Sequence, residues 1–179
     1  TLNTSSFLSN KNLQFQAFAI LHNSPIPNDI IRKTWDRSAR GLRFNFPNKP
    51  WSGSVSYREF GNSYDPAIGF VQRNSFRRVE PRINFSPLIE NSNIIRELTW
   101  EFSFENLMGL NWKKMTQNIR FTPLSIRFES GDELSYQFIK NFENLNFNFN
   151  ILGDNSIIIP IGIYPNWSHK IEFETANHR

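Results

Sequence analysis

Apolar and polar residues alternate along most of this chain. NLQFQAFAIL, residues 12–21, places Leu13 and Phe15 on one side of an extended strand and glutamines on the other. ELTWEFSFE, residues 97–105, alternates in the same way through Trp100. Further alternating stretches are residues 42–46, 51–60, 78–87, 124–128, 134–138, 145–151 and 167–176. A period of two is typical of antiparallel β-strands with one apolar and one polar face, so the pattern predicts an all-β fold.

The alternation is interrupted at a proline and at several turn sequences. Its phase shifts next to Pro123, which predicts a β-bulge there. In residues 145–151, Leu145 to Ile151, three asparagines form the polar side of the predicted strand. Turns are predicted at NKP (48–50), ENSN (90–93), SGDE (130–133) and GDN (153–155).

One segment does not alternate. IPNDIIRKTWDRSARG, residues 26–41, offers Asn28 as a helix N-cap, Ile31 and Trp35 four residues apart, and Gly41 as a stop. It predicts a short helix or an ordered loop. No internal repeat or linker divides the chain, so we expect residues 1–179 to form a single unit.

Two architectures accommodate such strands. A soluble β-sandwich packs its apolar faces together in a core, whereas a membrane barrel turns them toward lipid around a polar interior. Several strands have the roughly 9–11 residues needed to cross a bilayer, the polar sides carry both charge signs, and aromatic residues often end the apolar runs. These aromatic residues are Trp51, Tyr57, Trp112, Tyr164 and Trp167. The pattern therefore favours antiparallel amphipathic strands that form part of a transmembrane β-barrel, with the sandwich as the alternative.

Composition narrows this picture. Aromatic residues make up 15% of the 179 residues, whereas disordered chains are poor in them. The net charge of +4 comes from scattered residues, so we expect no nucleic-acid partner. The chain has no cysteine, which excludes disulfides and thiolate metal sites. It also has no apolar run of the roughly 20 residues that a transmembrane helix needs.

The stretches SYRE, YDPAIGFVQR and the following RR, which lie within residues 56–78, resemble a known family. The match continues in INFSPLIENSNIIRELTWEF, TPLSIRFESGDELS and IIIPIGIYPNWSHKIEFETANHR, and covers roughly residues 10–179. The family comprises uncharacterised outer-membrane β-barrel proteins known as carbohydrate-binding family 9-like domain proteins. The similarity lies in their C-terminal barrel domain, which has no established function.

This resemblance implies a location in the outer membrane of a Gram-negative bacterium. It implies membrane lipid and the remaining strands of the same barrel as partners. The family's N-terminal sandwich and final strands have no counterpart in the sequence, so we expect the chain to be an internal portion of the barrel domain. No activity and no carbohydrate-binding residue carries over from the family.

The candidate site is a set of charged residues in and next to residues 56–78, the first stretch that resembles the family. One interpretation is that arginines line a pore and select anionic or sugar-like solutes; the other, which we favour, is that they pair with nearby acids. Charges on a lipid-facing surface cost about 2–4 kcal/mol each near the midplane, so these residues are expected to face the barrel interior or a loop. We expect Pro66 and Gly69 to shape a tight loop that brings arginines and acids together. The predicted polar network comprises Arg58, Glu59, Asp65, Arg73, Arg77, Arg78, Glu80 and Arg82.

Catalytic chemistry has no support in the sequence. The histidines His22, His169 and His178 lack metal-ligand spacing, and neither a phosphate-binding loop nor a nucleophile elbow is present. Carboxylates such as Glu101 and Glu105 have the spacing of neighbours on one strand face. We therefore expect a protein that is not an enzyme and that has no metal and no cofactor.

Several aromatic residues have two interpretations, because a ring either stacks on a sugar or anchors the protein at the membrane interface. They are Trp35, Trp51, Tyr57, Tyr164 and Trp167. Three functions follow from the sequence. The first is an outer-membrane barrel segment with a role in transport or glycan-related binding. The second is a soluble extracellular sandwich that binds carbohydrate, and the third an accessory barrel subunit that contacts other outer-membrane proteins.

Overall fold

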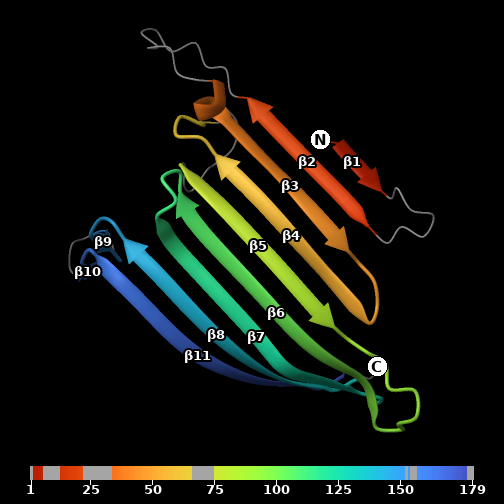
Figure 1. Cartoon of the computed structure of the whole chain (residues 1–179). Helices are drawn as coiled ribbons and strands as arrows, with labels where there is room; N and C mark the ends of the chain where they lie inside the picture. Colours follow the sequence, from red (N-terminus) through yellow and green to blue (C-terminus); the bar gives the residue numbers. More distant parts are fainter. Residues whose placement is uncertain are drawn as a thin grey trace, which may run out of the picture.

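The chain forms one large antiparallel β-sheet with an open, curved shape (Figure 1). The computed structural model describes residues 2–5, 13–21, 34–65, 75–151, 153 and 157–176. Nine strands pair in the order β1-β2-β3-β4-β5-β6-β7-β8-β11, so almost every strand lies beside its neighbour in sequence. They are β1 (Leu2–Ser5), β2 (Gln14–Leu21), β3 (Ser38–Phe46), β4 (Trp51–Phe60), β5 (Phe76–Phe85), β6 (Ile95–Gly109), β7 (Lys114–Phe128), β8 (Glu133–Leu145) and β11 (Gly162–Glu174).

The predicted all-β, antiparallel fold is confirmed, and so is the bulge beside Pro123. The pairing of β7 with β8 shifts register between Phe121 and Leu124, and the pairing of β6 with β7 shifts between Thr99 and Glu101. Proline has no N–H to donate to the neighbouring strand, so the ladder is interrupted where it occurs. The extra residue keeps Phe121 and Leu124 on the same face of β7, opposite Phe138 and Tyr136.

The predicted strand at residues 145–151 is wrong. β8 runs on to Leu145, the chain then bends, and only β9 (Phe149–Asn150) pairs with β10 (Ile158–Ile159) in a separate small ladder. Asparagine side chains explain the interruption, because they bond to nearby backbone groups and favour turns. Oδ1 of Asn150 accepts a hydrogen bond from the backbone N–H of Gly153 at 2.9 Å, and Oδ1 of Asn148 accepts one from Ile161 at 3.1 Å.

The predicted helix is reduced to one 3₁₀ turn, η1 (Thr34–Arg37), while Asn28 and Ile31 lie outside the described residues. Gly41 does not stop a helix; it lies inside β3, between Phe18 and Arg58. A Cβ there would lie 2.6 Å from Cε1 of Phe18 and 2.7 Å from the carbonyl oxygen of Tyr57. Glycine is therefore needed for close packing of neighbouring strands. No helix in the described ranges has the length and apolar character to cross a membrane.

The two faces of the sheet differ in chemistry and in exposure. We call one the apolar face; its large side chains are exposed, as Phe44 at 41% and Ile171 at 76% illustrate. The opposite, charged face carries serine, arginine and glutamate, and small polar side chains such as Ser135 are buried there at 9% exposure. Among the described residues, the buried hydrophobic side chains are limited to Ala39, Tyr64 and Phe76. The sheet therefore has no apolar core of its own in the part that the structure describes.

The residues that define each face follow from the strand registers. The apolar face includes Phe15, Leu42, Phe44, Val55, Ile83, Phe102, Phe121, Leu134, Phe138, Ile171 and Phe173. The charged face includes Arg43, Ser54, Ser56, Arg58, Arg78, Glu80, Arg82, Glu101, Ser103, Glu105, Asn118, Arg120, Ser125, Ser135 and Glu172.

Candidate functional site

Strand pairing assembles the polar side chains of the charged face into rows. Ser54 on β4 lies opposite Arg82 on β5, Arg82 opposite Ser103 on β6, and Ser103 opposite Arg120 on β7. Side chains directly opposite one another in antiparallel strands have Cβ atoms about 4.5–5.5 Å apart, so the row is continuous. Residues far apart in the sequence thus become neighbours through the order of the strands.

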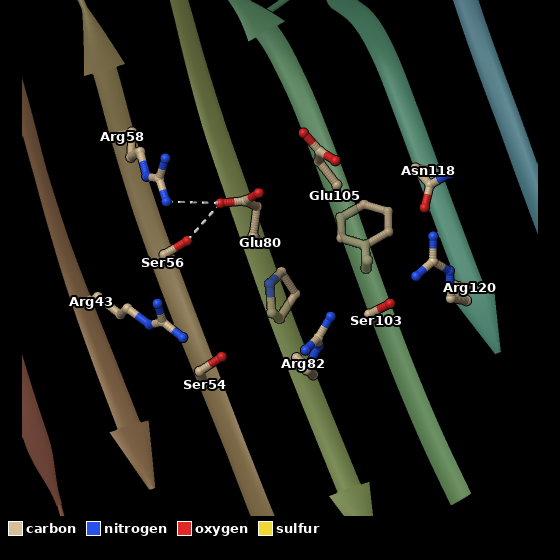
Figure 2. Close-up of a pocket in the computed structure, with 12 residues that line it drawn as sticks. Arg43, Ser54, Ser56, Arg58, Glu80, Arg82, Ser103, Glu105, Asn118 and Arg120 are labelled. Atoms are coloured by element: carbon tan, nitrogen blue, oxygen red, sulfur yellow. Dashed lines mark hydrogen bonds and ion pairs between the residues drawn. The ribbon is translucent and has the colours of Figure 1, made fainter. Parts of the chain in front are cut away.

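Glu80 is the centre of an ion-pair network on this face. Oγ of Ser56 donates a hydrogen bond to Glu80 Oε2 at 2.9 Å, and the guanidinium groups of Arg58 and Arg78 lie 3.8 and 3.5 Å from the same oxygen (Figure 2). Arg78 also reaches Glu105 at 3.4 Å. Arg58 and Arg78 are directly opposite in the β4–β5 ladder, so Glu80 offsets a repulsion between like charges.

A hollow of about 300 Å³ opens on the charged face over β3 to β7. We call it the basic hollow, because its charged lining residues are four arginines and two glutamates (Figure 2). Its lining comprises Arg43, Ser54, Ser56, Arg58, Glu80, Pro81, Arg82, Ser103, Phe104, Glu105, Asn118 and Arg120. Hydroxyl, amide and guanidinium groups together give it many hydrogen-bond donors.

A second hollow, of about 200 Å³, lies next to the first on β6, β7, β8 and β11. We call it the acidic hollow, since Arg120 is the one basic residue among its described lining residues. They are Thr99, Glu101, Arg120, Thr122, Ser125, Glu133, Ser135, Gln137, Glu172 and Glu174. Arg120 belongs to both hollows and marks the boundary between a basic and an acidic zone.

A separate charged cluster lies at one end of the apolar face. Arg40, Glu59 and Arg77 are directly opposite one another on β3, β4 and β5. Glu59, at 7% exposure, lies 2.5 Å from Arg40 and 3.1 Å from Arg77, and it accepts a hydrogen bond from the hydroxyl of Tyr57 at 2.5 Å. The guanidinium of Arg40 covers Trp35 and that of Arg77 covers Trp112, with carbon-to-centroid distances of 4.6 and 4.3 Å.

The structure thus divides the predicted polar network between the two faces. Arg77 and Arg78 are adjacent in sequence but point in opposite directions, as successive residues of a strand do. Arg58, Arg78, Glu80 and Arg82 are on the charged face, where Arg82 Nε is 3.7 Å from Glu101. Strand pairing brings Arg58, Arg78 and Arg82 to acids on neighbouring strands, and Arg78 also meets Glu80 two residues further along β5. Asp65 is exposed, and Arg73, Pro66 and Gly69 lie outside the described residues.

None of the aromatic candidates lines either hollow; Tyr57 belongs to the Glu59 cluster. Trp51 packs on Phe85, with the rings tilted and their centroids 4.4 Å apart, at the opposite end of the apolar face from Trp35. Trp167 packs on Phe138 at 5.0 Å, and the ammonium of Lys140 lies 4.4 Å above its ring. The hydroxyl of Tyr164 donates a hydrogen bond to the carbonyl of Pro160 at 2.8 Å.

Sequence reasoning missed Arg43, Arg120 and the serines of the basic hollow. The signal was present in the alternation, because Arg43 occupies the polar side of LRFNF and Arg120 that of the strand before Pro123. What was missing was the order and register of the strands. Within the described residues, no group of three or more His, Asp or Glu side chains is arranged to hold a metal ion. Searches among protein-family models, curated proteins and solved structures found no match to this chain.

Proposed function

We propose that this chain forms part of the wall of a transmembrane β-barrel in the outer membrane of a Gram-negative bacterium. In this proposal the apolar face contacts lipid and the charged face lines the interior. The observation that carries it is the inverted distribution of side chains: large hydrophobic residues are exposed on one face, while ionic side chains crowd together on the other. A membrane barrel has this arrangement.

The uncovered apolar face weighs against a soluble sandwich. Exposed apolar patches on soluble monomers rarely exceed a few hundred Å², and larger ones mark a contact with lipid or protein. Here the exposed hydrophobic side chains extend over the described strands from β2 to β11. In the described ranges no second layer packs on them.

Toward the Trp35 end of the apolar face, the apolar side chains give way to polar ones. This boundary crosses the strands on a diagonal, which supports a tilted, membrane-crossing sheet. Arg77 on β5 is opposite Met108, whereas the polar residue on β6 is Asn106, two positions further toward the other end. On β8 the first polar residue of this face is Lys140, which lies opposite Ile119 rather than opposite Gln117. The boundary is therefore two residues further along on β8 than on β6 and β7. Barrel strands tilt by about 35–45°, so a level boundary must run diagonally across their registers.

The connections between strands suggest an orientation. Residues 22–37, 61–75 and 146–161 join strands at the end of the sheet where Trp35 and Trp112 lie, and the shorter 110–113 joins β6 to β7 there. At the other end the turns 47–50 and 129–132 are short, and the connections 6–13 and 86–94 are longer than these turns but shorter than the three long connections. Outer-membrane barrels have short turns on the periplasmic side and longer loops outside. On this basis the Trp35 end faces the cell exterior, with the aromatic–arginine pairs at the outer interface.

The role we propose for this wall is non-enzymatic. It provides a polar surface for transport across the envelope or for glycan-related binding, and the glycan part rests on the family resemblance alone. An accessory barrel that contacts other outer-membrane proteins has the same fold and fits the same arrangement of faces. Membrane lipid and the remaining strands of the barrel are the expected neighbours in both cases.

The absence of cysteine makes a direct test of the lipid-facing side simple. Val55 and Ser54 are adjacent on β4, with Val55 on the apolar face and Ser54 in the basic hollow. In membranes containing the intact protein, Val55→Cys is expected to resist a charged, membrane-impermeant maleimide and Ser54→Cys to react with it. A spin label at Val55→Cys should be relaxed by oxygen dissolved in the bilayer.

The proposal fails if the intact protein is monodisperse in buffer without detergent. It fails equally if Val55→Cys reacts with the maleimide as fast as Ser54→Cys does. Labelling in detergent after unfolding is the control, because both cysteines should then react completely.

A further inference from the structure

The basic hollow contains more positive charge than its own acids neutralise. The carboxylates of Glu80 and Glu105 are engaged by Arg58 and Arg78, and Arg82 reaches Glu101. Arg43 and Arg120 remain: in the described part of the chain neither has an ion pair or a side-chain hydrogen bond. Two guanidinium groups therefore border the hollow without counter-charges.

Arg120 has a buried donor that no described residue of the chain satisfies. Its Nε atom is buried and has no hydrogen-bond partner. A buried donor that is left unsatisfied costs about 1–3 kcal/mol, more for a charged group, so such groups are rare unless something else completes them. Acids are close by in the acidic hollow, yet the side chains of Glu133 and Glu172 bond to Ser125, Arg127 and Lys170 instead.

The chemistry of the guanidinium groups of Arg43 and Arg120 indicates which class of ligand they would bind. The guanidinium group offers five N–H donors in a planar fork that matches the oxygens of phosphate and carboxylate. Ser54 and Ser103 lie in the same cross-strand row as Arg82 and Arg120 and add hydroxyl donors. Arg43, Arg82 and Arg120 approach the hollow from three different strands (Figure 2). Such a convergence fits a group with several charged oxygens, which a phosphate has and a single carboxylate lacks.

We propose that the basic hollow binds the phosphate group of an anionic solute, with Arg43 and Arg120 as the residues that recognise it. This inference deepens the function proposed above, because it assigns a ligand class to the barrel interior. The acidic hollow contributes selectivity, since Glu101, Glu172 and Glu174 repel a phosphate that moves past Arg120 toward β11. The field across the charged face therefore concentrates the anion over β3 to β7.

Calorimetric titration of the intact protein in detergent with inorganic pyrophosphate tests the site, with ionic strength held constant by sodium chloride. Arg120→Gln is expected to weaken pyrophosphate binding about tenfold, because a charge-assisted contact is lost. Adding Arg43→Gln should abolish measurable binding. Arg96→Gln is the matched control: it removes the same charge from an exposed arginine outside the hollow, and binding should stay within about twofold.

Two results would overturn the inference. One is a wild-type protein that binds pyrophosphate no better than chloride. The other is an equal loss in Arg96→Gln and Arg120→Gln, since the binding would then follow overall charge. The maleimide labelling of the single variants Ser54→Cys and Val55→Cys, measured in membranes, separates this inference from the barrel proposal. A protein that protects Val55→Cys from the maleimide but does not bind pyrophosphate contradicts the phosphate site and leaves the barrel proposal standing.

Discussion

Val55 and Ser56 are neighbours on β4, but Val55 is 41% exposed and Ser56 only 7%. The same contrast separates the two faces of the whole sheet. On the apolar face, Phe15 and Phe44 pack with their rings tilted and their centroids 4.8 Å apart, and both remain accessible from outside. On the charged face, Ser56 donates a hydrogen bond to Glu80 of the neighbouring β5, and the same carboxylate oxygen lies close to Arg58 of β4.

The difference in exposure between the two faces indicates the environment in which each face is stable. Burial of apolar area stabilises a soluble domain because water is excluded, and here that area is left uncovered. Many of the polar side chains, in contrast, bond to one another across strands, as Ser56 does to Glu80 and Arg78 to Glu105. The proposed barrel, with its ionic groups in a polar interior and its hydrophobic groups facing hydrocarbon, would account for both observations.

The largest expected effect comes from moving a charge onto the apolar face. Ile83 and Asn84 are adjacent on β5 and point to opposite faces. Ile83→Arg should lower the free energy of unfolding in lipid vesicles by about 2–4 kcal/mol, because a cation then faces hydrocarbon. Asn84→Arg, placed opposite Glu101, should change it by less than about 1 kcal/mol. Urea unfolding followed by tryptophan fluorescence measures both; equal losses would contradict the assignment of the faces.

An intermediate effect is expected at the cluster around Glu59. Glu59→Gln removes the only negative charge between Arg40 and Arg77 in this cluster of described residues, and should destabilise the folded protein by about 1–3 kcal/mol. Glu90→Gln, an exposed position in a turn, is the control and should stay within about 0.5 kcal/mol. Thermal unfolding of both variants in the same detergent makes the comparison. A loss no greater than that of the control would show that the cluster has no stabilising role.

The smallest effect belongs to the ion pairs of the charged face. Arg58→Ala should cost at most about 1 kcal/mol, because the pair is long and half-exposed and Glu80 keeps its contacts with Ser56 and Arg78. The loss should shrink as salt is raised, since screening weakens partly exposed pairs. Urea midpoints at low and high sodium chloride measure this. A loss above about 2 kcal/mol, independent of salt, would contradict it.

The local pattern of residues predicted the positions of most strands well. It did not predict which residues of different strands lie next to one another. The alternation located most strands, and the phase shift at Pro123 located the bulge, because both are properties of a single strand. The pattern failed at Asn150, because an asparagine whose side chain accepts a hydrogen bond from the backbone three residues further on favours a turn. The prediction for Gly41 was wrong for a related reason. Glycine is required there because a Cβ would collide with Phe18 and with the backbone of Tyr57, which belong to other strands.

By itself the sequence determined that this protein is built from two-faced antiparallel strands, because the period of its apolar residues is a local property of the extended backbone. It also determined that Arg77 and Arg78 point in opposite directions once both lie in a strand. Only the tertiary structure decided which charges meet. The pairing of Glu59 with Arg77, the row that ends in Arg120 and the division into a basic and an acidic hollow depend on register, and register is set by hydrogen bonds between strands rather than within one.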